Sequence, residues 1–203
     1  MNQIDVDGVG LVNHDIRGEG GPIETADEAM VLARVRAGET AAYAELVTRH
    51  APMAKRLAVL SGAGADADDV VQEAFVKAYR SLSSFRDGAA FRPWVLRIVV
   101  NECRNLHRGK SRRSDRELRV VREEARLTTA SDPAEVAVGA ERREALLGAV
   151  RALPEQLREV VSCRYLLELS ESETADSLGI PNGTVKSRLH RGLARLREEL
   201  SDV

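Results

Sequence analysis

Apolar residues recur at helical spacing along most of the chain, and period-two alternation never extends beyond a few residues. We expect a short helix over residues 29–37 that ends at Gly38, then a helix through 40–60 that Pro52 interrupts or kinks. A third helix begins at Asp66 or Asp68, since carboxylates stabilise the positive end of the helix dipole. Its predicted apolar face consists of Val71, Phe75, Ala78, Tyr79 and Leu82.

The pattern then divides the chain into two helical blocks. After a loop over 83–92, Pro93 suits the first position of a helix that continues through 94–108. Residues 109–133 are polar and rich in Arg, without a sustained apolar stripe, and they end in Asp132-Pro133, which suits a helix start. We therefore predict an all-α protein with two helical domains, 27–108 and 134–203, a flexible linker over 109–133 and a flexible acidic tail over 1–26.

Composition narrows the class of protein. Aromatic residues make up only 3% of the 203 residues, which disfavours a β-sandwich and fits helices built from Ala, Leu and Val. No run approaches the ~18 apolar residues of a membrane span, and the first residues are acidic rather than basic. Two cysteines, Cys103 and Cys163, are too few for a disulfide scaffold, and we expect both to be buried or partly buried. These features predict a soluble cytoplasmic protein.

Charge is distributed unevenly although the net charge is only −2. Residues 1–30 carry seven acids against one arginine, whereas residues 83–126 carry twelve basic groups against six acids. Residues 182–197 carry five basic groups and no acid. A lone basic run is usually a solvated helix face, but two runs on patterned helices indicate contact with a polyanion at two places.

The most specific local pattern lies in the second block. Ser170 and Glu173 form a potential capping box, Gly179 ends that helix, and Asn182 is a candidate cap for the next. The next helix has an apolar face of Val185, Leu189, Leu193 and Leu196 and a polar face of Lys186, Ser187, His190 and Arg191. This is the helix-turn-helix pattern, since the major groove of DNA, ~12 Å wide, admits one helix with outward donors. The alternative is an amphipathic hairpin with a solvated face.

Three motifs in order give a resemblance to a known family. They are Asp68-Asp-Val-Val-Gln-Glu-Ala-Phe, Phe85-Arg-Asp-Gly-Ala-Ala-Phe-Arg-Pro-Trp-Val-Leu-Arg-Ile-Val-Val-Asn and Pro181-Asn-Gly-Thr-Val-Lys-Ser-Arg-Leu-His-Arg. Together they resemble the bacterial extracytoplasmic-function sigma factors, group IV of the sigma-70 family. The resemblance implies sigma region 2 over 27–108 and sigma region 4 over 134–203.

The resemblance also implies function and partners. The chain would bind core RNA polymerase through the clamp coiled coil of the largest subunit and the flap, recognise and melt promoter DNA, and start transcription. It would have no catalytic residue, metal or cofactor and no membrane contact, and it would be a monomer when free. An anti-sigma factor commonly covers the binding faces in this family.

Site residues carry over from the family's motifs position by position. The residues implied to bind core polymerase are Asp68, Asp69, Gln72, Glu73 and Val76. Those implied to bind the −10 element, with a flipped base between loop and helix, are Phe85, Arg86, Asp87, Ala89, Arg97, Asn101, Arg104, Asn105 and Arg108. For Phe85, core packing is an equally open interpretation, and it is the favoured one for Phe91 and Trp94. The residues implied to bind the −35 element are Thr184, Lys186, Ser187, Arg188, His190 and Arg191.

The chain departs from the family pattern at two positions. Thr174 stands where the family commonly has an apolar residue, and Ser172 replaces a frequent aromatic one.

Two other classes of protein are alternatives. One alternative is a helix-turn-helix regulator that binds duplex DNA without being a polymerase subunit, which leaves the first two motifs unexplained. The other is a metal or redox enzyme using Cys103 and His107, four residues apart on one helix, but a structural zinc site needs four ligands.

Overall fold

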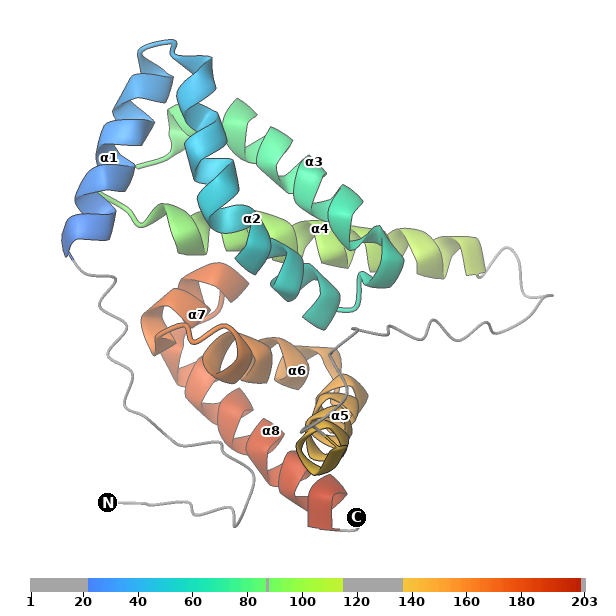
Figure 1. Ribbon diagram of the computed structural model, residues 1–203. Coiled ribbons are helices and arrows are strands. Elements are labelled where there is room, and N and C mark those ends of the chain that lie inside the picture. Colours follow the sequence, from blue (N-terminus) through green and yellow to red (C-terminus); the bar gives the residue numbers. More distant parts are fainter. Residues whose placement is uncertain (1–21, 87, 115–136, 202–203) are drawn as a thin grey trace.

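The structure, a computed structural model, describes residues 22–86, 88–114 and 137–201, and every regular element in these ranges is helical (Figure 1). The first four helices are α1 (Pro22–Arg36), α2 (Tyr43–Leu60), α3 (Ala67–Arg80) and α4 (Phe91–Ser114). The last four are α5 (Ala137–Ala152), α6 (Glu155–Val161), α7 (Glu171–Leu178) and α8 (Asn182–Ser201). The predicted all-α class with two helical domains is confirmed. Most of the predicted tail and linker, with Asp132-Pro133, lies outside the described residues.

The start of α1 and both ends of α4 differ from those predicted, and one predicted interruption is absent. Helix α1 begins at Pro22 rather than near residue 29, so the predicted tail ends earlier; proline suits a first helical position because its fixed φ is already helical. Helix α2 runs through Pro52 without a break. Its buried residues Leu46, Ala54 and Leu57 lie on both sides of the proline, and this burial outweighs the ~3 kcal/mol that an internal proline costs.

Helix α4 begins at Phe91, whose side chain is fully buried, rather than at Pro93 or Trp94. Pro93 lies in the first turn, where backbone N–H groups have no partner within the helix, so its missing donor is tolerated. The helix also extends past residue 108 to Ser114.

Helix α4 occupies the middle of the molecule. It packs against α2 and α3 on one side and against α7 on the other (Figure 1). One apolar cluster runs through it, because Val95 and Val99 of α4 are fully buried together with Leu57 of α2 and Leu178 of α7. A second, smaller cluster of Val150, Leu153, Val161 and Leu196 holds α5, α6 and α8 together.

The predicted signals around the second helical block are confirmed with one change. The Ser170 hydroxyl accepts a hydrogen bond from the Glu173 backbone N–H at 3.2 Å, and the Glu173 carboxylate accepts one from the Ser170 N–H at 2.9 Å. Gly179 ends α7 in the left-handed region, at a φ of 66°. Asn182 is the first residue of α8 rather than its cap. Between α6 and α7 lies a π-helical turn, Ser162–Leu166.

Both cysteines are buried, as predicted. Burial raises the pKa of the Cys103 thiol to about 11 and that of Cys163 to about 12, so both remain protonated at neutral pH. The His107 ring lies 3.2 Å from the Gly62 carbonyl oxygen. Among the described residues, no group of His, Cys, Asp and Glu is arranged to hold a metal ion, and no helix is long and apolar enough to cross a membrane.

The close crossing of α6 and α8 generates a test of the fold. A Cβ at Gly192 would lie 2.7 Å from Val161 Cγ2, which is closer than carbon atoms pack. Alanine is normally better than glycine in a helix by ~1 kcal/mol, but overpacking costs about 1–3 kcal/mol. We therefore predict that Gly192→Ala lowers the free energy of unfolding by up to ~2 kcal/mol, measured by chemical denaturation.

The matched control is Gly148→Ala in α5, because nothing lies within 4 Å of the added methyl group. That change should raise the free energy of unfolding by up to ~1 kcal/mol. Equal stabilisation by both substitutions would contradict the described crossing.

Candidate functional site

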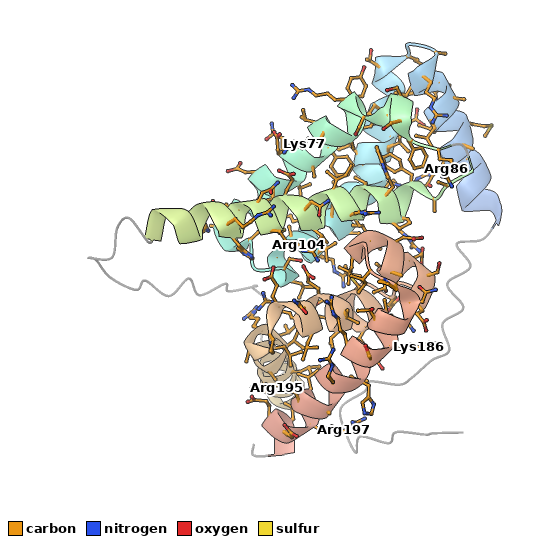
Figure 2. The ribbon with its side chains drawn as sticks, turned by 180° about the vertical axis from the view of Figure 1, so that it is seen from behind. Lys77, Arg86, Arg104, Lys186, Arg195 and Arg197 are labelled. Carbon is orange, nitrogen blue, oxygen red and sulfur yellow. The ribbon has the colours of Figure 1, made fainter. Side chains whose placement is uncertain are left out.

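The outer face of α8 carries the basic residues expected there. Lys186, Ser187, His190 and Arg191 are exposed, whereas Thr184 and Arg188 are half-buried. On the opposite side of the helix Val185 is fully buried, which fixes the rotation of α8 and turns the basic side outward. Figure 2 shows Lys186 in the first half of the helix and Arg195 in the second half.

Local contacts leave this face available to a ligand. The Ser187 hydroxyl donates to the Thr184 carbonyl at 3.1 Å, and Arg191 Nε donates to the Ser187 carbonyl at 3.3 Å. Lys186 Nζ lies 3.6 Å from a carboxylate oxygen of Glu171 on α7, a loose and exposed pair. Such an exposed pair contributes at most ~1 kcal/mol, so a phosphate can replace it. The first acids of α8 are Glu198 and Glu199, near its end.

The outer face of α3 forms a second surface. All five residues expected there, Asp68, Asp69, Gln72, Glu73 and Val76, are exposed. Asp68 pairs with Lys55 at 2.8 Å and Glu73 with Lys77 at 3.3 Å, both at the surface. This face is therefore acidic but partly neutralised at its edges, and Asp69 and Gln72 lie between the two pairs along the helix.

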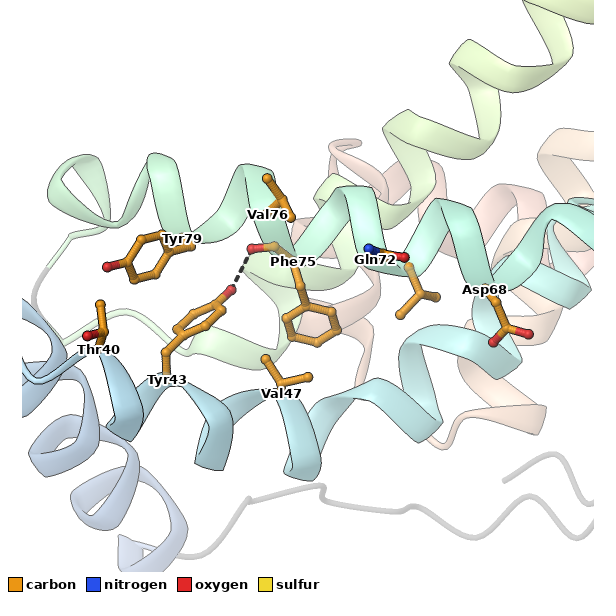
Figure 3. Close-up of a pocket in the computed structure, with 9 residues that line it drawn as sticks. Thr40, Tyr43, Val47, Asp68, Gln72, Phe75, Val76 and Tyr79 are labelled. Atoms are coloured by element: carbon orange, nitrogen blue, oxygen red, sulfur yellow. Dashed lines mark hydrogen bonds between the residues drawn. The ribbon is translucent and has the colours of Figure 1, made fainter.

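An apolar groove of about 590 Å³ runs beside these polar residues, between α2 and α3 (Figure 3). Its apolar lining consists of Tyr43, Val47, Val71, Phe75, Val76 and Tyr79, and Thr40, Asp68 and Gln72 complete it. The Tyr43 hydroxyl donates to the Phe75 carbonyl at 2.7 Å, and burial raises the pKa of this phenol, which keeps it a donor.

Sequence reasoning missed this groove. It placed Tyr79 on a buried face, but that side chain is 41% exposed. The contribution of Tyr43 and Val47 from α2 depends on how two helices pack, which periodicity within one helix does not reveal. The only local signal was the spacing of Phe75, Val76 and Tyr79, where apolar residues extend around more of α3 than one buried stripe requires.

The third surface is on α4. Arg97, Asn101, Asn105 and Arg108 are exposed along the helix, as expected for residues that contact a ligand. Arg108 donates to the Asn105 side chain at 2.6 Å, and Asn105 donates to Glu102 at 3.2 Å, so part of this row is ordered. Arg104 is different, because it is half-buried and faces the second half of the molecule (Figure 2).

The loop before α4 contributes less than the motif implied. Phe85 is only 5% exposed, and its ring lies 4.8 Å from that of Trp94 and 5.9 Å from that of Phe91, centre to centre. Its carbonyl accepts a hydrogen bond from Arg36. Phe85 is therefore a core residue in this structure, like Phe91, rather than part of an open pocket. Arg86 and Ala89 are exposed, and Asp87 lies outside the described residues.

Comparison with known proteins identifies the family. The model of Sigma-70 region 2 matches residues 46–113, and that of Sigma-70, region 4 matches residues 143–196. The ECF RNA polymerase sigma-E factor of Escherichia coli strain K12 is 34% identical over 174 residues, which cover 83% of this chain and 91% of that protein. The protein of the same name from Haemophilus influenzae is 32% identical over 187 residues, 89% of this chain and 98% of that one.

Solved structures agree in fold. CnrH in complex with the cytosolic domain of CnrY aligns at a TM-score of 0.64 and 25% identity, over 86% of this chain and 97% of that one. The sigma factor RpoE in complex with the anti-sigma factor NepR from Bartonella quintana aligns at a TM-score of 0.65 and 24% identity, over 78% and 96%. With both sigma-70 regions in order and relatives matched over nearly their whole length, the chain belongs to the ECF RNA polymerase sigma factors of the sigma-70 family.

Proposed function

We propose that this chain is a dissociable subunit of RNA polymerase that docks on the core enzyme through α3, contacts the −35 duplex through α8 and contacts the melted −10 element through α4. The observation that carries the proposal is the pairing of an acidic surface on α3 with an outward, basic surface on α8, each within its matching sigma-70 region. A regulator that binds DNA without polymerase would have no need of the α3 surface.

The docking role rests on charge and apolar area together. Asp69, Gln72 and Glu73 offer acceptors to an arginine-rich partner, and the adjacent groove offers apolar area beside Tyr79. Clustered apolar area rimmed by polar groups is typical of protein interfaces. The proposed occupant is the clamp coiled coil of the largest polymerase subunit, and we propose the flap as the partner of residues 134–203.

The DNA roles rest on the types of side chain. Lys186 and Arg191 supply charge-assisted donors to phosphates and base edges, and Ser187 supplies a shorter donor. On α4, the amide of Asn101 can pair with the exposed edge of an unpaired base, while Arg97 and Arg108 contact phosphates. Arg86 and Ala89 border this surface from the loop.

The remaining proposals follow from the family. We propose functional units over 27–108 and 134–203, a cytoplasmic location and regulation by an anti-sigma protein, which accompanies RpoE in one solved relative. Sigma factors are generally non-enzymatic regulators of transcription initiation, and we propose that this chain has no catalytic activity of its own. Nucleotide addition then belongs to the core enzyme.

Run-off transcription tests the function directly. Core polymerase, this chain and a library of promoter fragments are incubated with nucleotides, and the transcripts are sequenced. Transcripts that start at a shared motif only when the chain is present would support the proposal. Duplex binding without any stimulation of core polymerase would favour a regulator that is not a polymerase subunit.

Reversing the charge of α3 should disrupt docking. We predict that Asp69→Arg combined with Glu73→Arg weakens binding to core polymerase at least tenfold, or ~1.4 kcal/mol, because like charges then face the partner. Binding is measured by titration of labelled chain with core enzyme. The control is Asp176→Arg on the exposed side of α7, which should bind normally. Undiminished binding by a folded double variant would remove this surface from the interface.

Salt dependence should separate phosphate contacts from base contacts on α8. We predict that Arg191→Ala, if it loses a phosphate contact, lowers the slope of log affinity against log salt by ~1 for all duplexes. If Lys186 instead contacts a base, Lys186→Ala should lose about 1–3 kcal/mol of binding free energy for the −35 duplex. The variant should also discriminate less between bases at one base pair. The salt slope and the base preference are both measured as the affinity of polymerase carrying this chain for −35 duplexes. An unchanged slope and unchanged preference in both variants would contradict the assignment of α8.

Asn101 should act after the strands separate. We predict that Asn101→Ala leaves initial binding to closed promoter DNA nearly unchanged but reduces promoter opening, because its amide has no base edge to contact in the duplex. Permanganate footprinting of unpaired thymines measures opening, and a gel-shift measures initial binding. Normal opening by the variant would show that the base pocket lies elsewhere.

A further inference from the structure

The last residue of α1 holds one end of the loop that runs from Phe85 to Phe91 and leads into α4 (Figure 1). The guanidinium of Arg36 donates a hydrogen bond to the Phe85 backbone carbonyl. It also lies over the Phe85 ring, with 6.0 Å between its central carbon and the ring centre. A planar guanidinium can stack on a ring and donate from its edge at the same time. Arg36 therefore fixes both the backbone and the ring of the residue at which the loop begins.

A second residue of α1 acts on the other end of the loop through α2. Glu28 lies against His50 of α2, with 2.7 Å between a carboxylate oxygen and the ring Nε2, and both side chains are largely buried. The His50 ring in turn packs on that of Phe91, the first residue of α4, at 5.3 Å between ring centres. Both ends of the loop therefore rest on side chains that α1 holds in place.

The two held ends meet in one aromatic cluster beneath the loop. The rings of Phe85 and Phe91 lie 5.9 Å apart, and the Trp94 ring lies 4.8 Å from the first and 5.6 Å from the second. The described residues between the two ends, by contrast, are all exposed: Arg86, Gly88, Ala89 and Ala90. The direction in which Arg86 points therefore depends on how firmly the two buried ends are held.

We propose that Arg36 is a positioning residue for recognition of the −10 element, because it holds the loop so that Arg86 meets a base edge in one orientation. The proposal rests on the −10 role proposed above for the loop and α4. Helix α1 ends before the residues 46–113 that match Sigma-70 region 2, so the role concerns a part of the chain outside that match. Without this hold the loop takes several orientations, and base preference is lost more than overall binding.

Three single substitutions separate positioning from charge. Arg36→Ala removes both the stacking and the hydrogen bond, whereas Arg36→Lys keeps the positive charge but lacks the planar group that makes both contacts. The matched control is Arg34→Ala, which removes the same charge from the same helix. Arg34 pairs with Glu39 and Glu45. Both altered side chains are exposed, and chemical denaturation checks that each variant is folded.

The packing of the loop base is measured on the free full-length chain by fluorescence. Trp94 is the one tryptophan of the sequence and lies against Phe85, so quenching of its emission by acrylamide reports how well the loop base is packed. We expect the quenching constant to rise in Arg36→Ala and in Arg36→Lys and to stay at the wild-type value in Arg34→Ala. Equal quenching in all four proteins would show that Arg36 does not hold the loop.

Base recognition is measured with core polymerase carrying each variant, on promoter fragments with a randomised −10 element, by sequencing the transcripts. We expect preference for the best base at one −10 position to fall about tenfold in both Arg36 variants, which is the share that one good base contact supplies. Arg34→Ala should keep the wild-type preference. The proposal is wrong if both Arg36 variants keep that preference, or if Arg36→Lys keeps it and Arg36→Ala does not, since charge alone would then suffice.

Salt dependence distinguishes positioning from a phosphate contact made by Arg36 itself. Loss of a phosphate contact would lower the slope of log affinity against log salt by ~1 in Arg36→Ala. We expect an unchanged slope, because Arg36 acts through the loop, and a slope lowered by that amount would overturn the positioning role. Failure of the wild-type chain to direct any transcription would instead overturn the proposed function, whereas the quenching result would still show whether α1 holds the loop base.

Discussion

Helix α4 is the element on which the rest of the structure depends, because it packs extensively against both halves. Its apolar side, with Val95 and Val99, completes the core of α2 and α3. Two of its arginines, Arg104 and Arg92, pair with Glu159 on α6 and Glu173 on α7. A single helix thus contributes apolar side chains to a core shared with both halves and charged side chains to ion pairs with the second half, and this division follows from the positions of its arginines around the helix.

The three proposed binding surfaces follow the same rule, since each is the solvent side of a helix whose other side is buried. On α8 the full burial of Val185 fixes which side chains turn outward. On α3 the buried Val71 and Phe75 have the same effect, but here the neighbouring α2 covers Tyr79 only in part and a groove remains. Which side chains remain available for binding therefore depends on how completely each helix is covered by its neighbours.

The sequence predicted those features of the fold that depend on interactions between residues close together in the chain. The capping box of Ser170 and Glu173, the left-handed Gly179 and the apolar spacing of α8 are all interactions within a few residues, and each was predicted. The interruption that Pro52 predicts is absent because the burial that offsets the proline comes from other helices. Phe85 stayed undecided because its neighbour Trp94 is brought to it by tertiary packing. The pair of Arg104 and Glu159 spans 55 positions, and no periodicity connects them.

The boundary between α4 and the second half of the molecule combines apolar packing with ion pairs. Burial of its leucine and valine side chains contributes roughly 25 cal/mol for each Å² of apolar surface. A shielded ion pair contributes little net free energy, because the loss of hydration offsets most of the attraction, and its ions regain water when it opens. Glu173 illustrates the balance: burial by itself raises the pKa of its carboxyl, but hydrogen bonds from Arg92 and Ser170 lower that pKa below its ordinary value. The carboxylate is thus charged in this contact because Arg92 and Ser170 replace the water that burial removes, so the apolar packing supplies most of the stability of the boundary and the ion pairs determine which side chains meet.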